Sequence, residues 1–426
     1  LFEIFKTILS EDFIINTEPL FFKEDTSRDI KKRIADFFHE NLKVKKISID
    51  FKQLVWELII KLLYVKDINK EIETKRIQEN WMPRDMSLNS IYGIATNTLF
   101  AYISWVLESN PEKYKPVEKK LTKFFPEILK IIEYLLNEPL YTIRYIIGSN
   151  LYYLCHLDLD WLKSKINDIL PHDEEHLDYF EAAWTGFIDY NGIVVPFFKL
   201  FRPSYLYALS LLNKEFRLIP FSKVFFIDQI MILYIEGLEQ LNDEDSLIYK
   251  FFNTASGENR KIAIRNIGTK LKKYEDEEEL EKIKERLTTL LDYRLREASR
   301  ENITNFIEEL HAFIYWFRNS IFEEEWTINK LLEVLRLLND SFNESYFIPE
   351  ILENFVVRYP VQVIECLEII IKKEIREDFL LSENRYKIIL KVLINSENEE
   401  VNQKAVNLIN FLLRMNLHDF KDLLTS

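Results

Sequence analysis

Glycine is scarce in this chain, and its scarcity limits the folds that the chain can adopt. Only seven glycines occur among 426 residues, all of them between Gly93 and Gly268, whereas an average usage of about 7% would give roughly thirty. Tight hairpins, phosphate-binding loops and nucleophile turns use glycine because they need positive φ or close backbone approach. The sequence therefore disfavours β-rich folds and nucleotide chemistry, and it predicts a large all-helical protein that presents a surface.

The bulk composition narrows the class of protein further. Hydrophobic residues make up 47% of the chain, which supplies ample material for a continuous core and disfavours disorder. The net charge of −14 and the pI near 5.2 argue against direct nucleic-acid binding, which needs phosphate-neutralising Lys and Arg. A basic partner surface or a small ligand stays open.

Two features of the sequence bear on its location. Cys155 and Cys366 are the only cysteines, too few for a disulfide framework and typical of a reducing cytosol. The richest apolar stretch, residues 224–235, contains Asp228 and is shorter than the about twenty residues that a membrane span needs. We therefore expect a cytoplasmic protein without membrane contact.

The first residue is Leu1, and it lies inside the amphipathic pattern LFEIFKTIL. We expect the sequence to continue a longer polypeptide, in which any catalytic domain and any oligomerising domain would precede it.

Helical periodicity recurs along the chain. Two sets of apolar residues repeat at helical spacing: Ile283, Leu287, Leu290 and Leu291, and then Val401, Ala405, Leu408, Ile409 and Leu412. Ser396 and Glu399 have the spacing of a capping box ahead of the second set. Prolines fall between the apolar blocks and are expected to separate the helices: Pro83, Pro111, Pro116, Pro126, Pro139, Pro171, Pro196, Pro203, Pro220, Pro349 and Pro360.

Three segments share a weak internal similarity: EPLYTIRYIIGSNLYYL, SGENRKIAIRNIGTKLKK and ENEEVNQKAVNLINFLL. Each has a polar turn followed by an amphipathic helix with a basic or polar residue early in it, as in the second helix of HEAT-type repeats. A helix pair with an apolar face cannot bury that face alone, so pairs stack on one another. The sequence predicts an all-α, irregular HEAT/TPR-like solenoid with segments 1–80, 81–270 and 271–426.

Two charged clusters stand out, and both are interpreted as solvated. The acidic run comprises Glu275, Asp276, Glu277, Glu278, Glu279 and Glu281, which suits a helix start and marks the break before the last segment. Docking of a basic partner there is the alternative. Lys43, Lys45 and Lys46 form the main basic cluster, and we expect them in a solvated loop.

His172, Glu175 and His176 match the H-x-x-E-H pattern of inverzincin metallopeptidases. On a helix both histidines would share a face, with Glu175 placed to activate water. However, Pro171 puts His172 at a helix entrance, and no third ligand can be singled out. We interpret the segment as a solvated helix start, with a zinc hydrolase as the remote alternative.

Other candidate groups are better explained as core. Cys155 and His156 are neighbours in sequence, but successive helical side chains diverge by about 100°, so they are not partners across a site. Four tryptophans with nearby Tyr and Phe could form a stacking platform, although aromatic residues at helical spacing are more typical of core: Trp81, Trp105, Trp161 and Trp184. We predict no catalytic, cofactor-binding or metal-binding residue.

A family resemblance covers about a third of the chain, from about residue 81 to 215. Its order of patterns is an Asn-Ser-x-x-Gly helix, an Asp-x-x-Trp segment and an Ala-Trp-x-Gly helix. The residues that carry it are Asn89, Ser90, Gly93, Asp158 or Asp160, Trp161, Ala183, Trp184, Gly186 and Tyr205. This order resembles the C-terminal helical region of bacterial antiphage proteins built on STAND-type NTPases, and of related sirtuin-linked defence proteins. Tyr92 departs from the pattern, which has a basic residue before the glycine.

The resemblance implies a sensor. In such proteins the helical array recognises a viral protein, such as a packaging enzyme or a portal, and activates an attached NTPase and effector. The matching residues would be framework, with Gly93 and Gly186 permitting close helix approach and Trp161 and Trp184 filling the core.

The sequence thus favours a protein-binding sensor of antiviral defence, without catalysis or cofactor in this chain. Net negative charge would steer basic viral or nucleic-acid-handling proteins toward it. A constitutive HEAT-like scaffold unrelated to immunity is the alternative, and an upstream phosphate-binding loop would favour the sensor.

Overall fold

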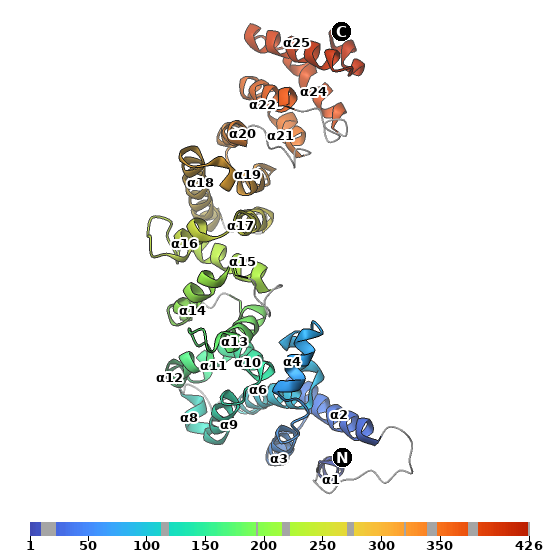
Figure 1. Ribbon diagram of the computed structural model, residues 1–426, viewed down its shortest axis with the longest axis vertical. Helices are drawn as coiled ribbons and strands as arrows, with labels where there is room; N and C mark the ends of the chain where they lie inside the picture. The colour runs from blue at the N-terminus through green and yellow to red at the C-terminus, as the bar shows by residue number, and fades with distance from the viewer. Residues whose placement is uncertain are drawn as a thin grey trace. The chain divides into compact units, whose positions relative to one another are not determined.

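The computed structural model describes residues 1–9, 23–111, 119–192, 195–214, 222–270, 277–318, 321–338, 347–373 and 382–424. These residues form helices joined by turns and loops, and they include no strand (Figure 1). The all-α class that the glycine scarcity predicted is confirmed.

The chain divides into two compact units, Leu1–Phe226 and Ile227–Ser426, called unit 1 and unit 2 below. The division lies inside α15 (Ser222–Ile235). The sequence-based boundaries lie elsewhere, after residue 80 between α4 and α5 and after residue 270 at the end of α17, and they stay predictions.

The helices of unit 1 are α1 (Phe2–Ile8), α2 (Lys23–Lys43), α3 (Lys52–Leu63), α4 (Lys70–Gln78), α5 (Pro83–Asn89), α6 (Ile91–Ser109), α8 (Lys120–Phe124), α9 (Pro126–Leu136), α10 (Tyr141–Ser149), α11 (Leu151–Leu157), α12 (Leu159–Ile169), α13 (Leu177–Tyr190) and α14 (Phe198–Leu211). Short 3₁₀ turns, η1 (Ile49–Phe51) and η2 (Val195–Phe197), precede α3 and α14.

The helices of unit 2, after α15, are α16 (Leu247–Thr254), α17 (Gly257–Lys270), α18 (Glu277–Arg300), α19 (Ile307–Phe313), α20 (Glu324–Leu338), α21 (Ile348–Phe355), α22 (Pro360–Lys373), α24 (Glu383–Leu393) and α25 (Glu399–Arg414). The 3₁₀ turns are η4 (Ile303–Asn305), η5 (Trp316–Arg318) and η7 (His418–Leu424).

The periodic apolar residues lie where the pattern predicted. Every member of the two sets is buried, the first in α18 and the second in α25. The predicted cap of α25 is wrong, because Asn398 and not Ser396 occupies the cap position. The Asn398 side chain accepts hydrogen bonds from the backbone N–H groups of Glu400 and Val401, at 3.0 and 3.3 Å.

Most prolines of the described residues lie at or between helix ends, as predicted. Pro83, Pro126 and Pro360 are the first residues of α5, α9 and α22, where the missing N–H has no intrahelical partner to lose. The prediction is wrong for Pro203, which lies inside α14. Pro116 and Pro220 lie outside the described residues.

Unit 1 is organised around a close crossing of α10 and α13. A Cβ atom on Gly186 would lie 2.0 Å from the carbonyl oxygen of Tyr145, and one on Gly148 would lie 1.9 Å from the carbonyl oxygen of Ala183. The two helices are therefore in backbone contact, which only glycine allows. Gly186 has the role that the resemblance implied for it, whereas the matching role of Gly148 was not anticipated.

Buried carboxylates fix the helix starts of unit 1. Glu73 of α4 is fully buried and accepts hydrogen bonds from the N–H groups of Tyr141 and Thr142, at 2.8 and 2.9 Å. Asp67 accepts from the N–H of Ile91 at 3.0 Å and caps α6 in the same way. A negative group at a helix N-terminus satisfies free N–H donors and complements the helix dipole. These contacts hold α6 and α10 in position.

One polar contact recurs in the three similar segments. Arg144, Arg260 and Asn402 are each the fourth residue of a helix, namely α10, α17 and α25. Each side chain donates a hydrogen bond to a backbone carbonyl at the end of the preceding helix, α9, α16 or α24. The contact satisfies a carbonyl that the helix end leaves without an intrahelical donor. The basic or polar residue noted in the sequence therefore links the two helices of each pair.

Unit 2 contains a buried ion cluster in addition to its apolar core. The Glu309 carboxylate is fully buried and pairs with Arg294 at 2.9 Å and with Arg260 at 2.8 Å. Burial raises the pKa of Glu309, and the two guanidinium groups oppose that rise. The cluster ties α17, α18 and α19 together.

Candidate functional site

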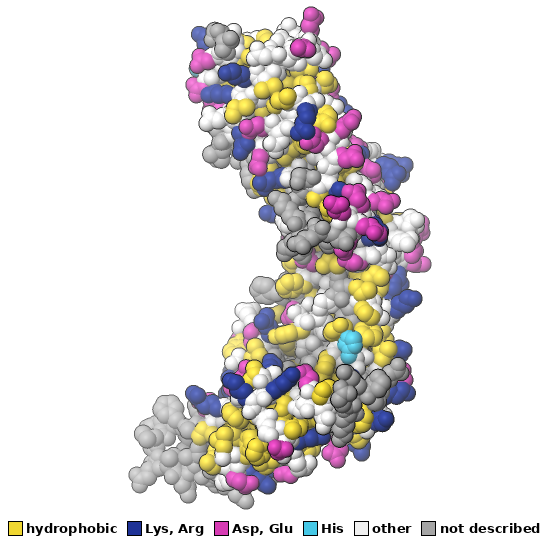
Figure 2. All heavy atoms as spheres, turned by 180° about the vertical axis from the view of Figure 1, so that it is seen from behind, with side chains coloured by type: hydrophobic (Ala, Val, Ile, Leu, Met, Phe, Trp, Pro, Cys, Tyr) yellow, Lys and Arg dark blue, Asp and Glu magenta, His cyan; other side chains and the backbone are white. Residues whose placement is uncertain are grey.

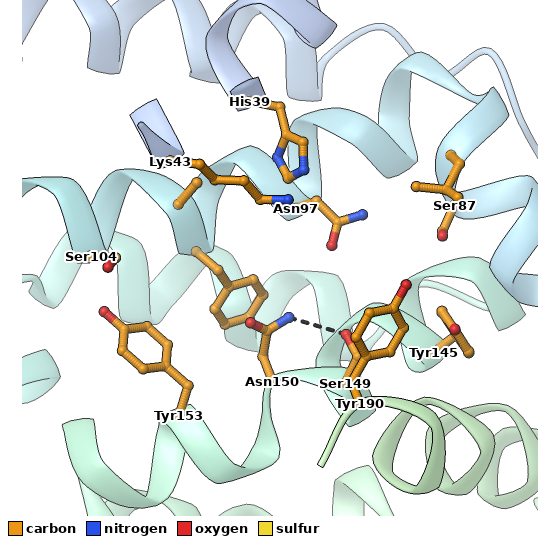
Figure 3. Close-up of a pocket in the computed structure, with 13 residues that line it drawn as sticks. His39, Lys43, Ser87, Asn97, Ser104, Tyr145, Ser149, Asn150, Tyr153 and Tyr190 are labelled. Carbon is orange, nitrogen blue, oxygen red and sulfur yellow. Dashed lines mark hydrogen bonds between the residues drawn. The ribbon is translucent and has the colours of Figure 1, made fainter. Parts of the chain in front are cut away.

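Unit 1 contains a half-open groove with a volume of about 350 Å³ (Figure 3). Helices from separated parts of the chain contribute its walls: α2, the neighbouring pair α5 and α6, α10 and α13, together with the start of α11. Its principal lining side chains are His39, Lys43, Asn97, Tyr145, Tyr153 and Tyr190. We call it the tyrosine groove.

The tyrosines provide the aromatic walls of the groove. Tyr190, the last residue of α13, is 56% exposed and packs edge-on against Tyr145 at 6.2 Å. Tyr145 is buried, and its hydroxyl donates to the Asp189 carboxylate at 3.2 Å. Burial raises the pKa of Tyr145 and of Tyr153 above the ordinary tyrosine value, so both hydroxyls stay protonated. Tyrosine presents a large rigid apolar face together with a hydrogen-bonding hydroxyl.

The opposite wall is polar and basic. His39 and Lys43 lie one turn apart on α2, and both side chains point into the groove toward Asn97 (Figure 3). Burial, together with the nearby Lys43, lowers the pKa of His39 to about 4. His39 is therefore neutral at pH 7, and its buried Nδ1 atom has no hydrogen-bond partner among the described residues.

No carboxylate lines the groove among the described residues, although the chain has 70 acidic residues. Two carboxylates close to its walls have partners. Glu108 accepts from the Ser104 hydroxyl at 2.6 Å and pairs with Lys45, and Asp189 accepts from Tyr145. Among the described residues that line the groove, Lys43 is the one full charge, and it is positive.

Two other hollows in the described residues are explained by buried arginines with structural partners. Beside α12, Arg144 donates to the carbonyl oxygens of Leu136 and Asp168 and stacks on the Tyr179 ring at 4.7 Å. In unit 2, a hollow lies over Arg260 and Arg294 of the ion cluster. The arginine contacts in both hollows join neighbouring helices.

The H-x-x-E-H segment does not form a zinc site. Residues 172–176 form a loop between α12 and α13, so the shared helix face that two zinc ligands need does not exist. His172 makes a hydrogen bond with the Ser204 hydroxyl at 2.9 Å, and His176 contacts its neighbour Asp173 at 2.8 Å. The described residues include no group of three His, Cys, Asp or Glu that could hold a metal ion. The expected helix entrance at His172 is wrong, because α13 begins at Leu177.

Cys155 and His156 point into different environments. Cys155 is buried, and burial raises the pKa of its thiol to about 12, which disfavours the reactive thiolate. His156 packs edge-on against the rings of Tyr152 and Phe197, at 4.6 and 5.2 Å. The pair therefore lacks the geometry of a nucleophile and its base.

Three of the four tryptophans are core residues, as interpreted from the sequence. Trp105 and Trp184 are at most 2% exposed, and Trp161 is 8% exposed with its indole N–H donating to Glu133 at 3.0 Å. Trp81 differs, since it is 36% exposed and lies beneath the Arg76 guanidinium at 5.2 Å.

The resemblance residues of the middle third are largely buried. Asp158, and not Asp160, is the buried acid: it caps α12 through the N–H of Trp161 and also accepts from the N–H of Thr122. Tyr205 packs edge-on against Trp184 at 5.0 Å. A Cβ atom on Gly93 would lie 2.7 Å from the carbonyl oxygen of Ser87, which explains the glycine there.

The structure places the acidic run at a helix start, as interpreted from the sequence, whereas the basic cluster is only partly a solvated loop. Glu277 to Glu281 lie in the first turns of α18, where Glu278 pairs with Lys282, and Figure 2 shows acidic side chains gathered over this region. Glu275 and Asp276 lie outside the described residues. The solvated-loop interpretation is incomplete for Lys43, which ends α2 and lines the groove.

Sequence reasoning missed the groove as a whole. Its lining residues come from separated segments, and none of them stands in a motif of short spacing. Tyr145 and Tyr153 lie in the segment EPLYTIRYIIGSNLYYL, but the pattern does not tell which of its tyrosines is exposed.

Comparison with known proteins gives no match: no family model, no curated protein and no solved structure matches the chain. In the described residues, no helix combines the length and apolar content needed to cross a membrane.

Proposed function

We propose that this chain is a protein-recognition module and that the tyrosine groove is part of its binding surface. The observation that carries the proposal is Tyr190, which is 56% exposed at the edge of a groove walled by further tyrosines. Tyrosine is one of the residue types enriched among those that dominate binding energy at protein interfaces. Leu88, 48% exposed, adds apolar surface at the same groove.

The architecture that we propose is an irregular HEAT-like array. The recurring contact from the fourth residue of a helix to the end of the preceding helix supports repeated helix pairs. Stacked pairs of this kind expose an extended surface for a partner. The groove is lined by helices of several such pairs, so a partner that fills it would contact several pairs at once.

The resemblance to antiphage sensor regions supplies the biological role in this proposal. The array would bind a phage protein, such as a packaging enzyme or a portal, and pass the signal to an NTPase or effector outside this chain. The buried positions of Trp161, Trp184 and Gly186 support a framework role for the resemblance residues. The contacts to a partner would then come from other residues, among them Tyr190.

The test is a direct titration of the purified chain with purified phage packaging enzyme and portal protein, followed by calorimetry. We expect one of them to bind, and Tyr190→Ala to weaken that binding by about tenfold or more. Tyr64→Ala is the matched control, because Tyr64 is 79% exposed and lies outside the groove.

Binding of neither phage protein would contradict the sensor role. A constitutive scaffold would instead bind a partner from uninfected cells. Equal effects of Tyr190→Ala and Tyr64→Ala on a partner that does bind would place the interface elsewhere on the chain.

A further inference from the structure

We infer that the tyrosine groove receives an acidic side chain of the partner, held by Lys43 and bordered by aromatic residues. The inference rests on the proposed function and names the chemistry of the segment that enters the groove. It also runs against the net charge of the chain, which favours basic partners.

The charge on the groove lining is the first argument. Lys43 is positive, and no carboxylate lines the groove among the described residues. Glu40 lies three residues before Lys43 on α2, but it is exposed and is not part of the lining. Glu108, on the same helix as the lining residue Ser104, is paired with Lys45. An incoming carboxylate would therefore meet one ammonium group without repulsion from the lining, and such charge complementarity favours one partner over others.

The hydrogen-bonding groups around Lys43 are the second argument. The Asn97 side chain faces Lys43 and His39 in the groove (Figure 3), and its amide N–H₂ group can donate to an oxygen. The neutral His39 ring supplies one further N–H. These donors suit a carboxylate, which accepts hydrogen bonds at both of its oxygens.

The charge of the groove lining favours a carboxylate over a phosphate group as the bound group. Of the described lining residues, Lys43 alone carries a full positive charge, and His39 is neutral at pH 7 because its pKa is lowered to about 4. A phosphate monoester carries a charge of about −1.5 to −2 at pH 7 and would exceed the charge that the groove supplies. A single Asp or Glu side chain matches it.

The walls define what flanks the acidic residue. Phe100 and the faces of Tyr153 and Tyr190 line the same groove. Aromatic or apolar side chains on either side of the acid would cover these rings, as in interfaces that surround a charged contact with apolar area. The groove is half open, so the segment is expected to be a protruding loop or an extended peptide.

The experiment is a selection of displayed random peptides on the purified wild-type chain and on three variants: Lys43→Glu, Tyr190→Ala and Lys46→Glu. Lys46 is the matched control, because it is exposed near the end of the same helix and does not line the groove. In the wild type we expect enriched peptides to carry Asp or Glu between aromatic or apolar residues. Lys43→Glu is expected to reverse the preference to Lys or Arg, whereas Lys46→Glu leaves it acidic.

The possible outcomes separate the two proposals. Two results would overturn this inference but leave the groove as a recognition site. In the first, the enriched peptides need Tyr190 but contain no acidic residue. In the second, peptides selected on Lys43→Glu still contain the acidic residue. If Tyr190→Ala removes none of the enriched peptides, the result would contradict both the recognition groove and its preference for an acidic side chain. Displacement of acidic peptides by AMP, at concentrations where sodium chloride of equal ionic strength has no effect, would identify a nucleotide site and overturn the inference.

Discussion

The close contact of α10 and α13 predicts that a single added methyl group, as in Gly186→Ala, destabilises unit 1. In Gly186→Ala the new Cβ atom would lie 2.0 Å from the carbonyl oxygen of Tyr145, whereas ordinary contact begins at 3.4 Å. The obstacle is helical backbone and cannot rotate away, so α10 and α13 must separate by about 1.4 Å along that line. Overpacking of this kind costs typically about 1–3 kcal/mol, occasionally more.

The net effect follows from two opposing contributions. Alanine is favoured over glycine within a helix by about 1 kcal/mol, so a steric cost of about 3 kcal/mol leaves a net destabilisation of about 2 kcal/mol. For a unit of this size each kcal/mol lowers the melting temperature by roughly 2–4 °C. We therefore expect Gly186→Ala to lower the melting temperature of unit 1 by roughly 4–8 °C, measured by circular dichroism. Urea denaturation should show a free energy of unfolding that is lower by about 2 kcal/mol.

Two further variants control the experiment. Gly192→Ala, six residues away, has no atom within 4 Å of the new Cβ and is expected to change stability by less than about 0.5 kcal/mol. Gly148→Ala is obstructed by Ala183 in the same crossing, so the double variant should cost less than the sum of the single ones. If Gly186→Ala destabilises no more than Gly192→Ala, the argument from backbone contact is refuted.

Further predictions concern buried groups in both units. Glu309→Gln leaves two arginines of the ion cluster without their carboxylate and should destabilise unit 2 by about 3–5 kcal/mol, whereas Glu365→Gln, which breaks a surface pair, should cost at most about 1 kcal/mol in the same urea titration. Because the pKa of His39 is lowered to about 4 in the folded chain, the unfolded chain binds a proton first as pH falls from about 6.5; the free energy of unfolding should decrease over this range, and His39→Gln should remove that part of the slope. Burial raises the pKa of both thiols, that of Cys155 to about 12, so a thiol reagent at pH 8 should label Cys155 and Cys366 slowly in the native protein and rapidly in urea; rapid native labelling would contradict their burial.

Local patterns in the sequence predict helices well but helix ends less well. The apolar sets around Leu287 and Leu408 are buried as predicted, because a stripe at helical spacing has to face other helices. The capping-box spacing predicts the cap of α25 at Ser396, two residues before the true cap at Asn398. Both residues can cap a helix, and the choice between them depends on where the preceding turn ends.

The candidate site residues show that spacing along the chain does not determine which side chains meet in space. His172 and His176 have the spacing of zinc ligands only if their segment is helical, and the structure makes it a loop. Gly148 stands next to the last residue of α10, and the need for glycine there follows from the contact with Ala183 of α13. The sequence places Lys43 beside Lys45 and Lys46, whereas in the structure it lines the groove with His39 and Asn97.

The sequence alone determined the all-helical class, because few glycines and recurrent helical spacing leave little else for so apolar a chain. Tertiary structure decided which surface carries the candidate site. The tyrosine groove exists only where α2, α6, α10 and α13 meet. The packing of these helices places Lys43 on a lining that includes no carboxylate among the described residues. Spacing along the chain records the face of each helix, whereas the groove depends on which faces are left uncovered after the helices pack.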